Sequence, residues 1–154
     1  MALKAYKQKR KFAKTPEPIG QIKTKGLNRF VVQKHQASHL HYDFRLELPE
    51  KIKTGNVVLK SWAVPKGVPI VPGIKHLAVA VEDHPVDYIN FSGVIPKGNY
   101  GAGTVEIWDK GKFKLLEYTA KSLKFELKGK VLKGRYVLTQ FTPQRKNWLI
   151  FKMK

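Results

Sequence analysis

The chain has 154 residues and no cysteine, and its 30 lysines and arginines against 11 aspartates and glutamates give a net charge of +19. This length favours one domain with a substantial core, and the lack of cysteine excludes disulfides and thiolate metal ligands, so any metal must be held by nitrogen and oxygen. No apolar stretch approaches the length of a membrane span and the N-terminus lacks the apolar segment of a secretory signal, so we expect a soluble cytoplasmic protein, a monomer with no membrane contact.

The predicted elements begin after a polar, basic lead-in. Residues 1–28 combine lysines with scattered proline and glycine and show no sustained period, which is typical of an arm rather than a folded layer. In the single domain that we expect over 29–154, strand patterns recur at 30–34, 40–48, 57–64, 77–82, 104–108, 113–117, 123–127, 135–140 and 148–152. Turn sequences such as Asp109-Lys110-Gly111 separate many of them. The sequence therefore predicts an all-β fold, a compact β-barrel of short antiparallel strands with a basic N-terminal arm.

The stretch 40–48 alternates strictly between apolar and polar residues. A period of two predicts a β-strand with one buried face. The opposite face has His41, Asp43, Arg45 and Glu47, with successive side chains roughly 7 Å apart. The alternative is a solvent-facing strand with ordinary polar decoration.

A metal site is the first function that this strand suggests. His41 and Asp43 share a face, and His35 precedes them closely enough to supply a third ligand. Two imidazoles and one carboxylate leave coordination positions open, as catalytic sites do. The mixed nitrogen and oxygen set makes manganese a natural candidate, and zinc or iron would also fit. A non-haem iron oxygenase is a rival hypothesis, in which His84 or His76 would be the remaining histidine.

Further polar residues suggest an anion beside the metal. A guanidinium such as that of Arg45 can clamp a phosphate, although it can also pair with Glu47 or Asp43. In the segment 79–88, His84 could orient a phosphate or protonate a leaving oxygen, and Tyr88 could add a hydroxyl contact. Glu82 could fix the tautomer of a ligand imidazole. Individually, each is more often a polar residue at the end of a strand.

Two other patterns favour structural roles. The glycine-rich stretch 98–103 precedes a strand and lacks a following Gly-Lys-Ser/Thr, so we predict a tight turn rather than a nucleotide loop. Trp62, Trp108 and Trp148 lie in strand patterns, which favours core packing over base stacking.

The charge is concentrated at the two ends of the chain. Residues 1–34 have ten basic and one acidic side chain and residues 110–154 thirteen and two, whereas residues 35–109 have seven and eight. Basic ends around a near-neutral centre suit a polyanion bound at the periphery. A lysine-rich solvated surface is the alternative, but the excess is larger than solubility requires. We therefore expect nucleic acid as the partner and a nucleoid-associated location.

Ordered motifs cover nearly the whole chain. They are FVVQKH at 30–35, LHYDFRLE at 40–47, KSWAVPKG at 60–67, VEDHP at 81–85, IPKG at 95–98, YGAG at 100–103 and NWLI at 147–150. With these motifs the sequence resembles the 3′-phosphoesterase domain of bacterial DNA ligase D and its stand-alone archaeal relatives. The resemblance implies a metal-dependent enzyme, typically using manganese, that removes a 3′-terminal ribonucleoside and then a 3′-phosphate from DNA ends and leaves a 3′-hydroxyl for break repair.

The same resemblance implies roles for individual residues. By motif position the metal ligands are His35, His41 and Asp43. The groups that hold the scissile phosphate are Arg45 and His84, and Tyr88 matches an essential tyrosine. The supporting positions are Gln33, Glu82, Arg10 and Glu17.

Two departures from the family pattern bear on function. Lys11 stands where the family commonly has aspartate, which bears on the balance between ribonucleoside removal and phosphatase activity. Ser92 stands where glutamate is usual. No polymerase or ligase sequence accompanies the domain, so we expect those partners to be separate chains. A non-catalytic nucleic-acid-binding barrel remains a rival hypothesis, which the intact set of candidate residues argues against.

Overall fold

Antiparallel strands make up most of the computed structural model, which describes all residues except 1–2, 21–22, 24–25, 52–53 and 142–144. The helical elements are α1 (Lys4–Gln8) and the 3-10 turn η1 (Val86–Asn90). The strands are β1 (Arg29–Gln36), β2 (Leu40–Lys51), β3 (Thr54–Val64), β4 (Lys75–His84), β5 (Gly93–Ile95), β6 (Gly103–Tyr118), β7 (Ser122–Gly129), β8 (Lys133–Gln140) and β9 (Asn147–Lys152). Within the described residues, no helix is both long enough and apolar enough to cross a membrane.

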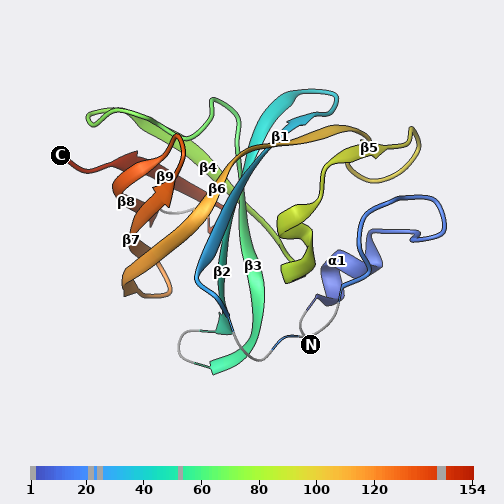
Figure 1. Cartoon of the computed structure of the whole chain (residues 1–154), viewed down its shortest axis with the longest axis horizontal. Coiled ribbons are helices and arrows are strands. Elements are labelled where there is room, and N and C mark those ends of the chain that lie inside the picture. The colour runs from blue at the N-terminus through green and yellow to red at the C-terminus, as the bar shows by residue number, and fades with distance from the viewer. Residues whose placement is uncertain (1–2, 21–22, 24–25, 52–53, 142–144) are drawn as a thin grey trace.

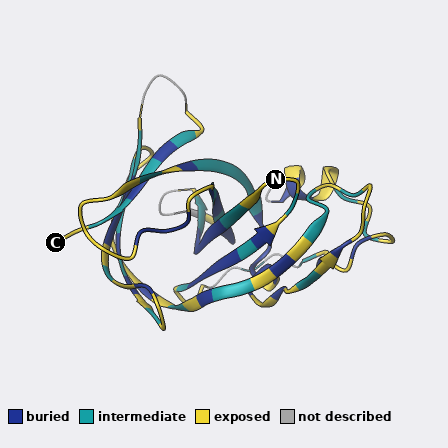
Figure 2. Ribbon diagram, turned by 90° about the horizontal axis from the view of Figure 1, so that it is seen from above, coloured by how far each residue is buried: buried dark blue, intermediate teal, exposed yellow. Residues whose placement is uncertain are grey.

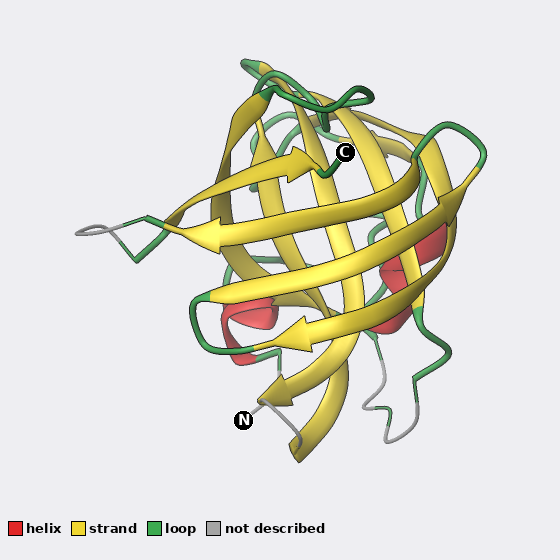
Figure 3. Ribbon diagram, turned by 90° about the vertical axis from the view of Figure 1, so that its left-hand side faces the viewer, coloured by secondary structure: helices red, strands yellow, loops and turns green. Residues whose placement is uncertain are grey.

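The sheet closes on itself. Its strands follow the order β1-β2-β3-β4-β9-β8-β7-β6-β5, and β1 also pairs with β6, so eight strands form a closed barrel and β5 lies outside it on β6. All of these pairs are antiparallel. Figure 3 shows the strands crossing the barrel wall at the front with the helical segments behind them. The all-β barrel predicted from the sequence is confirmed.

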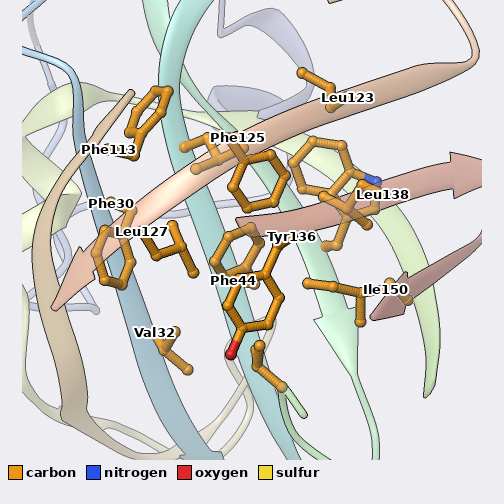
Figure 4. Close-up of a cluster of buried hydrophobic side chains, with 14 of the residues drawn as sticks. Phe30, Val32, Phe44, Phe113, Leu123, Phe125, Leu127, Tyr136, Leu138 and Ile150 are labelled. Carbon is orange, nitrogen blue, oxygen red and sulfur yellow. The ribbon is translucent and has the colours of Figure 1, made fainter. Parts of the chain in front are cut away.

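An aromatic and aliphatic core fills the barrel (Figure 4). Phe44 of β2 stacks on Phe125 of β7 with ring centroids 5.7 Å apart, and Phe125 stacks in turn on Tyr136 of β8. Trp62 and Trp148 meet edge to face in the same core, as predicted, whereas Trp108 is partly buried against it. Close packing of this kind fixes the positions of the surrounding strands.

A second apolar cluster lies on the outer face of β1, β3 and β6. It combines Val31 and Leu59 of the barrel wall with Tyr6 of α1 and with Tyr88 and Ile89 of η1. Figure 1 shows α1 and η1 beyond β3 on the same side of the barrel. This part of the wall is therefore sandwiched between two apolar layers.

The covered outer face corrects the prediction that the strand at 40–48 has one buried face. Asp43, Arg45 and Glu47 are 6%, 3% and 2% exposed, so the polar face of β2 is as buried as its apolar face. Leu40, expected on the buried side, is 48% exposed at the start of the strand. Alternation identifies the two faces of a strand but says nothing about what covers each of them.

The predicted N-terminal arm is more ordered than its composition suggests. Tyr6 is fully buried, its hydroxyl donates to the carbonyl of Pro18, and Thr15 and Glu17 are also buried. Parts of the arm, residues 1–2, 21–22 and 24–25, lie outside the described residues. The described part of the lead-in packs against the barrel through Tyr6. Its polar residues Arg10 and Glu17 line the pocket described below.

The predicted turn at Asp109-Lys110-Gly111 is wrong, because β6 runs through it without interruption. The carboxylate of Asp109 accepts hydrogen bonds from the backbone N–H groups of residues 110, 130, 131 and 132, and so holds the turn between β7 and β8. Gly111 lies opposite Gly129 on β7, where a Cβ on Gly111 would be 2.3 Å from the carbonyl oxygen of Lys128. Gly111, which we expected in a turn, instead allows β7 to approach β6 closely.

Candidate active site

The site residues predicted from the sequence meet in one pocket on the outer face of the barrel, between the wall and the lead-in. The cavity has a volume of about 230 Å³. Nine of the ten predicted residues line it: Arg10, Glu17, His35, His41, Asp43, Arg45, Glu82, His84 and Tyr88. The tenth, Gln33, is fully buried behind Arg45. Residues from the lead-in and from four strands or turns thus converge although up to 78 positions separate them.

Three of these side chains form a group with metal-binding geometry. Nδ1 of His35 is 3.3 Å from one oxygen of Asp43, and Nε2 of His41 is 3.2 Å from the other. The ligand atoms of the three residues all lie within 4.8 Å of one another. The register explains the convergence, because β1 and β2 pair His35 with His41 and Gln33 with Asp43.

Backbone carbonyls set the tautomers of both histidines. Nε2 of His35 is 2.7 Å from the carbonyl oxygen of Gly101, and Nδ1 of His41 is 3.1 Å from that of His39. A carbonyl accepts, so these two nitrogens carry the protons when the rings are neutral. In that neutral state the nitrogens facing Asp43 have free lone pairs, as ligand histidines do in metal sites, whereas they donate to Asp43 in the metal-free protein when the rings are protonated. The residues present fit a divalent cation.

The charges around Asp43 keep it ionised. Burial by itself would raise the pKa of Asp43, but the guanidinium of Arg45 and hydrogen bonds from the two histidines outweigh it and hold the pKa well below 3.8. The hydrogen bond to Asp43 raises the pKa of His41 against the opposing effect of burial. Without a metal, the cluster therefore holds a carboxylate that attracts a cation.

Arg45 is the second element of the site. Its Nε donates to Oε1 of Gln33 at 2.7 Å, and Nη2 lies 3.5 Å from Asp43. The guanidinium lies over the ring of Tyr88, 4.8 Å from its centroid. Nη1 is buried and has no hydrogen-bond partner among the residues that the structure describes. Glu47, the other expected partner, binds Arg29 instead through two oxygens.

His84 is neutral and presents a lone pair to the pocket. Its Nδ1 donates to the carbonyl of Glu82 at 2.9 Å, and Nε2 accepts from Nη2 of Arg10 at 3.3 Å. Burial, together with the charges of Arg45 and Arg10, lowers the pKa of His84 well below 6.5. In this state Nε2 can accept a hydrogen bond, and the orienting or acid role expected from the sequence stays a prediction. The carboxylate of Glu82 points to Lys9, at 2.8 Å, and not to a ligand imidazole.

Glu17 ties the lead-in to the site. One of its oxygens accepts from Nε of Arg10 at 3.0 Å and from the hydroxyl of Tyr88 at 2.6 Å, and the other accepts from Thr15. Burial raises the pKa of Tyr88 further above 10, so its hydroxyl remains protonated and donates. The guanidinium of Arg10 lies 4.0 Å over the ring of Tyr6. This network holds both Arg10 and Tyr88 against His84.

Comparison with known proteins agrees with this arrangement. Residues 33–140, which include all three residues of the ligand group, match the model of the DNA Ligase D 3′-phosphoesterase domain. The chain belongs to this phosphoesterase family. It is 47% identical over 162 residues to the multifunctional non-homologous end joining protein LigD of Pseudomonas aeruginosa, and 43% identical over 159 residues to the corresponding DNA repair protein of Mycobacterium tuberculosis. These alignments cover 99% of the chain but 18% and 20% of the relatives, so the chain spans about a fifth of their length.

The departure from the family pattern at Lys11 lies away from the pocket. Lys11 is exposed and does not line the cavity, whereas the preceding Arg10 does. Tyr100, which was not among the site residues expected from the sequence, lines the pocket and is 46% exposed. Lys9 and Arg10 lie 4.9 and 5.2 Å from the centroid of its ring. The signal in the sequence was an aromatic residue in the YGAG motif, for which we predicted only a tight turn.

The rival oxygenase triad is not formed by the described residues. Neither His76 nor His84 belongs to the group that could hold a metal among the described residues. Nδ1 of His76 is 2.6 Å from the carbonyl oxygen of Gly67, and Nδ1 of His84 donates to the carbonyl of Glu82. The group that can hold a metal, within the part of the chain described here, contains His35, as the phosphoesterase resemblance implies.

Proposed function

We propose that this protein is a metal-dependent phosphoesterase that heals DNA 3′ ends, removing a 3′-terminal ribonucleoside and then a 3′-phosphate to leave a 3′-hydroxyl. The observation that carries the proposal is the convergence of the ligand group and Arg45 in one pocket, where the buried Nη1 of Arg45 has no hydrogen-bond partner among the described residues. A buried donor without a partner is costly, so its retention suggests a ligand oxygen that completes it. A phosphate oxygen matches a guanidinium in charge and geometry.

The metal would be held by His35, His41 and Asp43, and the oxygen-containing ligand set is compatible with manganese, with zinc and other divalent ions also fitting. A bound divalent cation supplies Lewis-acid polarisation of a phosphoryl oxygen. The single carboxylate and two neutral imidazoles leave coordination positions for that oxygen.

The residues around the metal position would divide the remaining work. Arg45 binds the phosphate and stabilises the charge that develops on its oxygens. Gln33 and the ring of Tyr88 hold that guanidinium in place. Nε2 of His84 accepts a hydrogen bond from a substrate hydroxyl that takes the place of the Arg10 donor beside it, and so orients that hydroxyl. Arg10, once released from His84, can contact a second phosphate oxygen.

The proposed partners are DNA 3′ ends during non-homologous end joining. The relatives named above are multifunctional end-joining proteins that extend well beyond this domain. A ligase and a polymerase would then use the 3′-hydroxyl that this protein exposes, in a separate chain or in the same one.

A labelled primer-template tests the proposal. A 5′-labelled primer ending in a 3′-phosphate or in a single ribonucleotide is incubated with manganese, and the products are resolved by length and charge. We expect one ribonucleoside to be lost, followed by the phosphate. Arg45→Gln should abolish both steps.

Arg29→Gln is the matched control, because Arg29 is also a strand arginine but its guanidinium is engaged by Glu47 outside the pocket. This variant should retain both activities. Binding of the duplex without turnover by the wild-type protein, across manganese, zinc, magnesium and cobalt, would instead favour the non-catalytic barrel.

A further inference from the structure

Three lysines form a row across the outer surface of the barrel, away from the pocket. Lys112 of β6 is directly opposite Lys128 of β7, which is directly opposite Lys133 of β8. All three are exposed, and their neighbours Phe113 and Leu127 point into the core, so the ammonium groups share the outer face. Figure 2 shows buried and exposed positions alternating along such strands. Adjacent strands are about 4.8 Å apart, so the row spans roughly 10 Å.

This row is not neutralised by the protein. In the part of the chain that the structure describes, none of the three lysines forms an ion pair. Like charges directly opposite one another on neighbouring strands destabilise a sheet. The row therefore brings no stability to the fold.

The adjacent outward positions on the same strands are balanced. Lys114 lies opposite Glu126, which lies opposite Arg135, and Lys124 lies opposite Glu117. At these positions, two to five residues along the strands from the row, each basic side chain has a carboxylate across from it in the register. The lysine row is a local exception to a pattern of compensation and not a general property of a basic surface.

The backbone beneath the row is held rigid. Asp109 accepts four backbone hydrogen bonds, three of them from the turn between Lys128 and Lys133. A buried carboxylate that holds this turn keeps the two lysines at its ends in register. Binding a ligand across them then requires little ordering of the backbone.

Lys112, the end of the row nearest to β1, lies at a definite distance along the strands from His35 at the pocket, and Lys128 and Lys133 lie one and two strands farther around the barrel. Along β1, Arg29 is opposite Lys112 and His35 is opposite Val105 of β6. The six residues from Arg29 to His35 correspond to about 20 Å of strand. Along a DNA duplex, with about 3.4 Å per phosphate on one strand, this equals about six base pairs.

We propose that the row of Lys112, Lys128 and Lys133 binds the phosphodiester backbone of duplex DNA about six base pairs from the 3′ end in the pocket. The inference rests on the proposed function for the position of that end. Three unpaired cations across about 10 Å match two to three consecutive phosphates. The row would therefore hold the duplex while the pocket holds its terminal phosphate.

The test is the salt dependence of binding to a 14-base-pair duplex ending in a 3′-phosphate, with the triple variant Lys112→Gln, Lys128→Gln, Lys133→Gln. We expect the slope of log affinity against log salt to become shallower by about 2 to 3, and affinity at 0.1 M salt to fall at least about tenfold. Hydroxyl-radical footprinting should show protection about six base pairs from the phosphate with the wild type, and loss of it with the variant.

The control is the triple variant Lys114→Gln, Lys124→Gln, Arg135→Gln, which removes the same charge from the same strands but at balanced positions. It should keep most of the affinity and the footprint. Equal losses in the two variants, or wild-type binding by the row variant, would overturn the proposal. If the proposed function is wrong, the wild type will release no phosphate. The binding measurement can still be interpreted in that case, because it does not depend on turnover.

Discussion

Gln33 and Arg45 are joined across neighbouring strands by a hydrogen bond of 2.7 Å from Nε of the arginine to Oε1 of the glutamine. The amide nitrogen of the same glutamine donates to the carbonyls of Tyr88 and Phe91, at 2.9 and 3.0 Å. Gln33 therefore fixes the guanidinium relative to the segment that supplies the ring beneath it. It does so from full burial, without lining the pocket.

Gln33→Met should show whether Gln33 contributes to activity by positioning Arg45, since Gln33 does not line the pocket. The methionine keeps the volume but removes the partner of Nε of Arg45 and one hydrogen bond from each of the carbonyls of Tyr88 and Phe91, of which that of Tyr88 keeps its bond from the N–H of Phe91. We therefore expect a loss of roughly 2–4 kcal/mol in the free energy of unfolding. A guanidinium that is no longer fixed should lower the rate of phosphate release by about 10- to 100-fold. Urea denaturation and single-turnover assays measure the two effects. Gln140→Met, at an exposed amide, is the control, and a wild-type rate in Gln33→Met would contradict the positioning role.

Asp43→Asn should weaken metal binding and change the pH dependence of stability. The pKa of Asp43 in the folded protein lies below its ordinary value of 3.8. Its ionised form therefore stabilises the fold above about pH 4, and this stabilisation is lost as the pH falls toward the folded pKa.

In the metal-free protein at pH 7, we expect Asp43→Asn to lower the free energy of unfolding by about 2–4 kcal/mol, because Arg45 loses a buried counter-charge. The difference from the wild type should narrow below pH 4. Calorimetry with manganese should show loss of high-affinity binding. A difference in the free energy of unfolding that stays constant between pH 7 and pH 3 would show that the charge of the Asp43 carboxylate does not stabilise the fold.

The sequence was sufficient for the barrel and for the ligand group because both depend on local patterns. The alternation at 40–48 places His41, Asp43 and Arg45 on one face, and antiparallel pairing with the preceding strand adds His35 to it. These relationships need only the period of a strand and a short connection.

The remaining contacts join residues far apart in sequence, which no local pattern contains. Glu17 meets Tyr88 across 71 positions, so the burial of the polar face could not be read from β2 itself. At Asp109 the local chemistry of a turn was present, but the partner that decided its conformation, the backbone of residues 130–132, is more than 20 positions away. Pairing across the sheet overrode the local turn preference.

Tyr88→Phe should distinguish the hydroxyl of this residue from its ring. The ring would remain beneath Arg45, while Glu17 would lose the donor that now lies at 2.6 Å. We expect a stability loss of about 1–2 kcal/mol and retention of substrate affinity, with a smaller loss of rate than in Tyr88→Leu. Steady-state kinetics on a 3′-phosphate duplex measure both. An inactive Tyr88→Phe protein of wild-type stability would mean that the hydroxyl contacts the substrate directly.

Gly129→Ala should destabilise the protein through steric contact at the turn between β7 and β8. The new methyl group would lie 2.3 Å from Oδ2 of Asp109 and 2.7 Å from Cζ of Phe30, both of which are buried. Movement of the carboxylate would break its hydrogen bonds to the turn, so we expect a loss of about 3 kcal/mol or more. Thermal and urea denaturation would measure it against Gly26→Ala, whose methyl group would lie no closer than 3.3 Å to its nearest neighbour, Val57. Equal stability of the two variants would mean that β7 can move away from β6 without cost, and that Asp109 does not hold the lysine row in place.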